Sequence, residues 1–206
     1  MTRSPILHPG PRLLLGAGRA PELAGLLPAG PVLLVTDASV RSLGLADPLL
    51  AELERDHDVL LFDAVEADPS RATLLAAVEK GRGGGAQSVI GFGGGSPMDV
   101  AKLAAYLLGS GEDLDTIWGV GLARGRRLPL ALVPTTAGTG SEATPVAIIT
   151  VEGDEKRGVN SAPLIPDIAV LDPSLTLGKP RALTAATGID AMVHAIEAYT
   201  SAKAKN

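Results

Sequence analysis

Short aliphatic runs alternate with longer segments of helical periodicity along most of the chain. This alternation is typical of a parallel sheet covered by helices on both faces, because strands buried on both sides read as continuous apolar runs. The pattern therefore predicts an α/β domain. Its strands are expected at residues 32–36, 59–62, 88–92 and 130–133, and its helices at residues 48–53, 69–78 and 97–108.

Two further aliphatic runs, at residues 146–150 and 168–171, are expected to form late strands that pair around the charged turn at residues 152–155. The pattern then becomes helical and is strongest at residues 184–201.

We predict a domain boundary in the Gly178-Lys179-Pro180 segment, where Gly and Pro interrupt the pattern. Residues 1–178 would form the α/β domain, and residues 179–206 the first helix of a second, helical domain.

Composition excludes several classes of protein. The net charge of −5 provides no basic surface for nucleic acid, and aromatic residues make up only 2% of the chain. No apolar run reaches the roughly 18 residues of a membrane helix, and the first residues lack the pattern of a signal peptide. Because there is no cysteine, a metal would have to be held by His and carboxylate groups. We expect a cytoplasmic protein.

A glycine loop follows the strand at residues 88–92. We expect Ser96 to cap a helix whose first residue is Pro97, so that Gly94, Gly95 and Ser96 present free amides to a phosphate group. The alternative is a tight turn without a ligand. Asp99, near the start of this helix, is either a carboxylate favoured by the helix dipole or a ligand contact.

Two other loops also follow strands. Asp37 comes directly after the first predicted strand, where a carboxylate binds ribose hydroxyls and repels a 2′-phosphate, which favours NAD over NADP. The alternative is a simple helix cap. Residues 134–142 place four hydroxyl side chains and two glycines after another strand, as a loop that binds a second part of a dinucleotide would.

Asp190 and His194 lie four residues apart, on one face of the last predicted helix. One carboxylate and one imidazole would suit Fe²⁺ or Zn²⁺, although such a pair also occurs as a surface contact. The neighbouring residues are apolar, so we expect this helix to be buried over much of its circumference. His8 and His57 lie too early in the chain to be convincing further ligands. Either no metal binds, or the other ligands lie beyond Asn206.

Four segments together resemble the iron-containing (group III) alcohol dehydrogenase family: residues 93–102, residues 134–142, residues 165–173 and residues 188–199. The resemblance implies a Rossmann-like NAD-binding domain of the dehydroquinate synthase-like fold, followed by the start of an all-helical domain. It implies that Asp37 contacts the adenosine ribose, that Gly94, Gly95 and Ser96 hold the pyrophosphate, and that Asp99 lies beside the nicotinamide. The other cofactor contacts it implies are Thr135, Thr136, Thr139, Thr144, Lys156 and Leu175.

By the same resemblance, Asp190 and His194 match the first two of four metal ligands and would be catalytic through the metal. The implied reaction is NAD- and metal-dependent oxidation of a primary or short-chain alcohol to an aldehyde or ketone, and the reverse. The expected metal is Fe²⁺, with Zn²⁺ as the alternative, and the intact enzyme is expected to be a homo-oligomer.

The resemblance also implies that this chain is a truncated family member, inactive alone. Two alternatives remain: a non-catalytic dinucleotide-binding fragment, or a related enzyme of the glycerol dehydrogenase, maleylacetate reductase or dehydroquinate synthase type. Ser96 stands where glycerol dehydrogenases usually carry Lys, and Asp190 argues against maleylacetate reductases.

Overall fold

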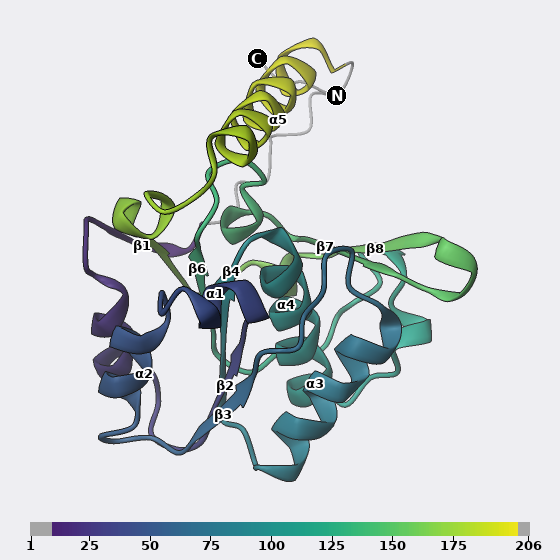
Figure 1. Ribbon diagram of the computed structural model, residues 1–206. Helices are drawn as coiled ribbons and strands as arrows, with labels where there is room; N and C mark the ends of the chain where they lie inside the picture. Colours follow the sequence, from purple (N-terminus) through teal and green to yellow (C-terminus); the bar gives the residue numbers. More distant parts are fainter. Residues whose placement is uncertain (1–9, 202–206) are drawn as a thin grey trace.

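The computed structural model describes residues 10–201 and contains a six-stranded parallel sheet with helices on both faces (Figure 1). The strand order is β1-β9-β6-β4-β2-β3, and a second sheet has the order β5-β8-β7. The prediction of an α/β fold is thereby confirmed. The strands are β1 (Arg12–Leu15), β2 (Val32–Val35), β3 (Val59–Phe62), β4 (Ser88–Gly93), β5 (Gly119–Val120), β6 (Leu130–Pro134), β7 (Val146–Thr150), β8 (Lys156–Asn160) and β9 (Ile168–Leu171). The α-helices are α1 (Ala38–Ser42), α2 (Asp47–Leu53), α3 (Arg71–Gly83), α4 (Gly95–Ser110) and α5 (Arg181–Thr200).

The main sheet separates two hydrophobic cores. Along β2, Leu33 and Val35 face the core built with α3 and α4, whereas Val32 and Leu34 face the core built with α2 and the short helix at Ala20–Leu26. Successive side chains of a strand point to opposite faces, so a strand between two helical layers must be apolar throughout. This explains why the central strands appear in the sequence as unbroken aliphatic runs.

The sheet order places a topological switch point between β2 and β4. From β2 the chain proceeds to the edge strand β3, and it then returns to form β4 on the other side of β2. Loops that leave the carboxyl ends of β2 and β4 therefore diverge to opposite faces of the sheet and leave a crevice between them. Ligands of open α/β sheets bind in such crevices.

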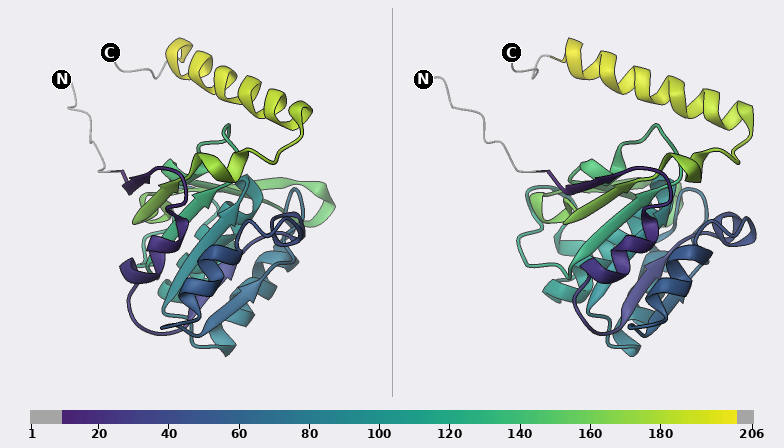
Figure 2. Two further views of the ribbon diagram at one scale, coloured as in Figure 1. Left: turned by 60° about the vertical axis from the view of Figure 1, so that its left-hand side comes forward. Right: turned by 90° about the vertical axis from the view of Figure 1, so that its left-hand side faces the viewer.

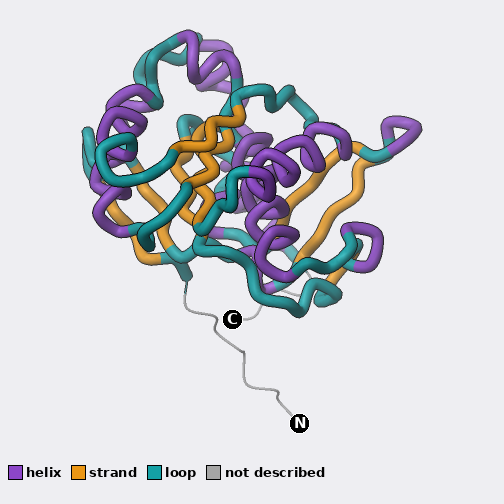
Figure 3. The backbone as a smooth tube through the Cα atoms, turned by 90° about the horizontal axis from the view of Figure 1, so that it is seen from below, coloured by secondary structure: helices purple, strands orange, loops and turns teal. Residues whose placement is uncertain are grey.

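The predicted pairing of the two late strands is wrong. β7 pairs with β8 in an antiparallel hairpin, and β9 instead joins the main sheet between β1 and β6. β8 has the polar sequence Lys-Arg-Gly-Val-Asn and was not predicted as a strand; it forms because the turn at Glu152–Asp154 places it beside β7. The hairpin extends away from the main sheet (Figure 3).

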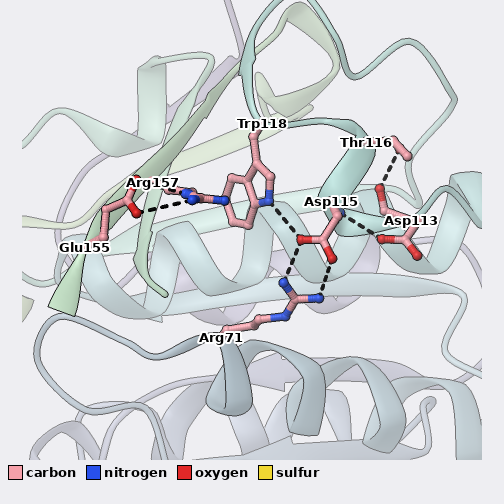
Figure 4. A network of polar contacts seen from close by, with 7 residues as sticks. All are labelled: Arg71, Asp113, Asp115, Thr116, Trp118, Glu155 and Arg157. Atoms are coloured by element: carbon pink, nitrogen blue, oxygen red, sulfur yellow. Dashed lines mark hydrogen bonds and ion pairs between the residues drawn. The ribbon is translucent and has the colours of Figure 1, made fainter. Parts of the chain in front are cut away.

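Beside this hairpin, polar contacts join the start of α3 to the segment before β5 (Figure 4). Arg71, at the start of α3, donates two hydrogen bonds to Asp115, at 2.6 and 2.8 Å, and the Trp118 indole donates a third at 3.1 Å. These hydrogen bonds lower the pKa of the Asp115 carboxyl to about 2, and those from Arg71 have the largest effect. On β8, Arg157 pairs with Glu155 at 3.0 Å.

Helix α5 projects from the α/β domain (Figure 2). None of its residues is buried, and Ile189, Met192 and Ile196 are among its exposed apolar side chains. The expectation that this helix is buried over much of its circumference is therefore wrong for the described residues, because the sheet domain contacts only the early turns of the helix. Within residues 10–201, no helix combines the length and apolar character that crossing a membrane requires.

Candidate functional site

A pocket of about 350 Å³ lies at the switch point of the main sheet. It is formed by the segments that follow three adjacent strands: Asp37 to Ser39 after β2, Val65 to Ala67 after β3, and Gly94 to Pro97 after β4. Lys179 completes the lining. Of the residues predicted to bind the cofactor, the structure thus brings Asp37, Gly94, Gly95 and Ser96 together around one cavity.

The glycine loop enters α4 earlier than predicted. Gly94 occupies the N-cap position and Gly95 is the first helical residue, so the prediction of Ser96 as the cap is wrong. No side chain caps this end of the helix. A serine cap would have used its hydroxyl to satisfy one of the free amides, whereas a glycine cap leaves the first amides available to a ligand. A glycine at the N-cap therefore favours anion binding at the start of α4.

The glycine loop lies against the loop of residues 134–142. A Cβ atom on Gly94 would lie 3.6 Å from the Thr136 hydroxyl oxygen, and one on Gly95 would lie 3.2 Å from Cγ2 of Thr139. Gly93 has a φ angle of +151°, and the Cβ atom of any other residue at this position would collide with Pro97. The predicted phosphate loop and the predicted threonine loop are therefore neighbours, and glycine keeps the space between them open.

Two threonine hydroxyls beside this space are buried without a partner. Four such unpartnered side-chain atoms occur within residues 10–201, and they include Oγ1 of Thr135 and Oγ1 of Thr136. Thr135 is completely buried. Because buried hydroxyls are almost always hydrogen-bonded in folded proteins, these two are groups that a polar ligand or an ordered water at the loop would satisfy.

Asp37 caps α1, as one of the two interpretations from the sequence predicted, and its contact with a ribose stays a prediction. Its Oδ1 atom accepts a hydrogen bond from the Val40 amide at 2.9 Å and another from the Ser39 hydroxyl, so it caps α1. It also lines the pocket. Oδ2 faces the glycine loop, since a Cβ on Gly93 would lie 3.2 Å from it. The carboxylate is therefore held in a fixed position while one oxygen remains directed toward the pocket region.

Asp99 and Thr144 belong to a buried cluster centred on Lys102. The Lys102 ammonium donates to the Ser141 hydroxyl and to the Val146 carbonyl, each at 2.8 Å, and to Thr144 at 3.3 Å. Ser141 in turn donates to Asp99 Oδ1 at 2.7 Å, and the Lys102 ammonium lies 3.9 Å from the same oxygen. The cluster fixes the end of the threonine loop to α4.

Burial dominates the titration of this cluster. It lowers the pKa of Lys102 to about 8, although the nearby carboxylates of Asp99 and Glu142 oppose the shift. Burial likewise raises the pKa of Asp99 above its usual range, against the effects of Lys102 and the hydrogen bonds from Ser141 and the Ile148 amide. The sequence did not single out Lys102 as a site residue. The sequence feature that could have identified Lys102 is its position among the small apolar residues of α4, three residues after Asp99.

Lys156 and Leu175 do not line the pocket. The Lys156 ammonium pairs with Asp68 at 2.6 Å on the surface, and Leu175 is buried in the core beside β9. Their assigned contacts with the cofactor stay predictions. Glu66 and Lys179, in contrast, line the pocket but were not found from the sequence, because both lie on loops without a recognisable motif.

The Asp190–His194 pair lies on the exposed helix α5. Nε2 of His194 is 3.5 Å from Oδ1 of Asp190, so the two side chains share one face and present one nitrogen and one oxygen donor. No group of three or more metal-binding side chains occurs among residues 10–201. Both ring nitrogens of His57 contact backbone carbonyls, at 3.1 and 3.0 Å, and His8 lies outside the described residues.

The threonine loop reaches α5 directly. A Cβ on Gly138 would lie 2.7 Å from the Thr187 carbonyl oxygen, which shows that the two backbones are in close contact. Asp190 follows Thr187 by three residues, and residues three apart lie on the same side of a helix. The Asp–His pair is therefore close along the helix to the loop that carries the unpartnered threonines.

Comparisons with known proteins agree with this arrangement. The family model described as iron-containing alcohol dehydrogenase matches residues 10–173. Long-chain-alcohol dehydrogenase 1 of Geobacillus thermodenitrificans is 40% identical over 177 residues, which are 84% of this chain and 45% of that protein.

Solved structures give the same result. A crystal structure of 1,3-propanediol oxidoreductase matches with a TM-score of 0.90 at 34% identity, covering 95% of this chain and 53% of the other. Sulfoacetaldehyde reductase from Bifidobacterium kashiwanohense, solved in complex with NAD⁺, matches with a TM-score of 0.84 at 30% identity, covering 96% of this chain and 53% of the other. The chain spans about half the length of these relatives.

Proposed function

The chain belongs to the iron-containing alcohol dehydrogenase family, and we propose that it binds NAD for the oxidation of a primary or short-chain alcohol and the reverse reduction. The observation that carries the proposal is the pair of buried, unpartnered hydroxyls of Thr135 and Thr136 beside the uncapped start of α4. A dinucleotide has both an anionic pyrophosphate and polar groups that would satisfy these two features at once.

The proposed contacts with NAD run from Asp37 past the glycine loop to the threonine loop. Asp37 would accept hydrogen bonds from the ribose hydroxyls, and its negative charge would disfavour the 2′-phosphate of NADP. Gly94, Gly95 and Ser96 would donate backbone amides to the pyrophosphate. Thr135, Thr136 and Thr139 would line the remaining path toward α5. Asp99 would help to position the nicotinamide end, because Ser141 and Lys102 hold its carboxylate in place.

Asp190 and His194 would hold the metal ion, Fe²⁺ or alternatively Zn²⁺, since both ions accept a carboxylate and an imidazole ligand. When bound, the ion supplies a Lewis acid for the alcohol oxygen, and NAD supplies the hydride acceptor. This chain's part is to hold the two groups near each other. The contact of Gly138 with Thr187 supports that placement, because it joins the threonine loop to the metal-binding helix.

We place the domain boundary at Gly178-Lys179-Pro180, between the α/β domain and α5. We also expect the 206-residue chain alone to bind NADH weakly and to show no alcohol oxidation. Asp190 and His194 supply two donors, and the described residues contain no cluster of three. Iron-dependent turnover by the purified 206-residue chain would contradict this expectation.

A single added methyl group tests the proposed cofactor site. Gly94→Ala would place a Cβ atom at ordinary contact distance, 3.6 Å from Thr136, so the fold should tolerate the substitution. The added methyl group would nevertheless occupy part of the space between the glycine loop and the threonine loop. We expect the Kd for NADH to rise roughly tenfold, about 1.4 kcal/mol, with an unchanged melting temperature. Gly83→Ala is the matched control, because a Cβ there meets nothing within 4 Å.

Nicotinamide fluorescence titration of the three proteins decides the question. Equal NADH affinity of the unaltered chain and the Gly94→Ala variant would remove the glycine loop from the cofactor site. Loss of affinity in both variants would mean that the effect is not specific to the loop.

A further inference from the structure

The charged groups around the switch-point pocket are unevenly distributed. Two acidic residues, Asp37 and Glu66, and one lysine, Lys179, line it together with the start of α4. Glu66 is already engaged: its carboxylate accepts hydrogen bonds from the Ser70 amide at 2.8 Å and from the Thr73 hydroxyl at 2.7 Å. Among the described residues, Lys179 is the one residue with a cationic side chain that lines this pocket.

Lys179 is held at the pocket by its backbone. It lies between Gly178 and Pro180, after the short helix Pro173–Thr176, and its amide donates to the Thr176 carbonyl at 3.3 Å. Its side chain is partly buried, and none of the ion pairs found within residues 10–201 involves it. A lysine that lines a pocket and has no carboxylate partner can offer its ammonium to an anionic ligand.

The position of Lys179 relative to the glycine loop identifies the anion. Gly94, Gly95 and Ser96 line the same cavity as Lys179, and the first amides of α4 favour negative charge there. Oδ2 of Asp37 also faces the glycine loop, so a phosphate bound there would need cationic groups that offset this negative charge, and Lys179 is one such group in the pocket lining. The region beside the glycine loop is therefore where Lys179 would meet a phosphate.

We propose that Lys179 is a cofactor-binding residue that pairs with the pyrophosphate of the dinucleotide opposite the start of α4. This inference rests on the proposed function and extends it. Because Lys179 is two residues before the first residue of α5, the pyrophosphate contact also fixes the start of the helix that carries Asp190 and His194. Cofactor binding and the placement of the metal-binding helix would be linked through this one residue.

The experiment compares ligands with and without a pyrophosphate. Kd values for NADH, ADP-ribose and adenosine are measured by calorimetry for the unaltered chain and for Lys179→Ala, Lys179→Arg and Lys80→Ala. Lys80, exposed near the end of α3 and away from the pocket, is the matched control. Circular dichroism melting confirms that each variant is folded.

We expect Lys179→Ala to weaken NADH and ADP-ribose by the same factor, about tenfold, as the loss of one charge-assisted hydrogen bond implies, and to leave adenosine unchanged. Lys179→Arg should retain most of the affinity, because arginine also pairs with phosphate. The affinity of Lys179→Ala for NADH should also depend less on salt concentration.

Unchanged NADH and ADP-ribose affinities in Lys179→Ala would overturn the inference while leaving the proposed function intact. Equal weakening of adenosine would also overturn it, because adenosine has no phosphate. Failure of the unaltered chain to bind NADH would overturn the proposed function and this inference together.

Discussion

The buried ammonium of Lys102 gives the most quantitative prediction. Lys102→Met keeps a flexible stem of similar size in the core but removes the charge that lies among Ser141, Thr144 and the Val146 carbonyl. The side chain of Lys102 is completely buried, so solvent does not screen the effect of removing it. The difference in stability between the two proteins should therefore change with pH.

Its magnitude follows from the pKa of Lys102, which burial lowers from 10.5 to about 8. Since the pKa is lower in the folded chain, the unfolded chain binds more protons between about pH 8 and pH 10.5, and the free energy of unfolding rises with pH across that window. The full rise in the free energy of unfolding is about 3 kcal/mol, because each pKa unit between the folded and unfolded states corresponds to about 1.4 kcal/mol. Below about pH 8 both states carry the proton, and this contribution no longer changes with pH.

The assay is urea unfolding of the unaltered chain, Lys102→Met and the surface control Lys80→Met at about pH 7 and about pH 10. We expect the unaltered chain to gain roughly 2 to 3 kcal/mol relative to Lys102→Met between these values. Lys80→Met should parallel the unaltered chain. If the stability curves of the unaltered chain and Lys102→Met stay parallel, the buried ammonium is not as desolvated as the structure indicates, and the reasoning is refuted.

Three further variants test other contacts. Thr135→Val keeps the shape of the side chain but removes an unpartnered buried hydroxyl. It should therefore raise the free energy of unfolding by about 1 kcal/mol in urea titrations while weakening NADH binding. Lower stability would show that the hydroxyl has a partner within the fold. Asp37→Ala should lower stability by about 1 kcal/mol through loss of the α1 cap and should reduce the preference for NADH over NADPH, and an unchanged preference in paired titrations would leave Asp37 as a cap only. Tyr106→Phe removes a hydroxyl that donates to Glu112 at 2.6 Å and accepts from the Gly125 amide at 2.8 Å. Thermal melting should show that the free energy of unfolding falls by about 1 to 2 kcal/mol. A change in NADH affinity would contradict the purely structural role of this hydroxyl.

Most of the main sheet was predictable because its central strands are buried on both faces. The runs that form β2, β4 and β6 are apolar at nearly every position, and no other element of that length fits between two helical layers. The edge strand β1 was missed, since Leu13 and Leu15 are exposed and its four residues give little pattern. β8 was missed because its polar residues form a strand only through pairing with β7.

The wrong pairing of β9 has a related cause. Sequence proximity favoured a hairpin between the two late aliphatic runs, but Ile168, Ala169 and Val170 are all buried and therefore need cover on both faces. The main sheet provides that cover and the small sheet does not. The tertiary environment, which is not visible in the local pattern, determined the partner of this strand.

The candidate site was predictable where it depends on loops after strands. Asp37 and the glycine loop converge because parallel strands place their carboxyl ends at one edge of the sheet. Lys179 was not predictable, because its segment carries no recognisable motif, and the position of Lys102 three residues after Asp99 did not by itself show that its ammonium is buried. Only the packing of α4 against β7 and the fold of the segment before α5 reveal their positions.

Amide hydrogen exchange with and without saturating NADH locates the bound cofactor along the chain. We expect slower exchange in peptides covering residues 93–98 and 134–142, and unchanged exchange in the exposed end of α3. Absence of protection in both loops at saturating NADH, or protection confined to other segments, would contradict the assignment of the switch-point crevice as the NAD site.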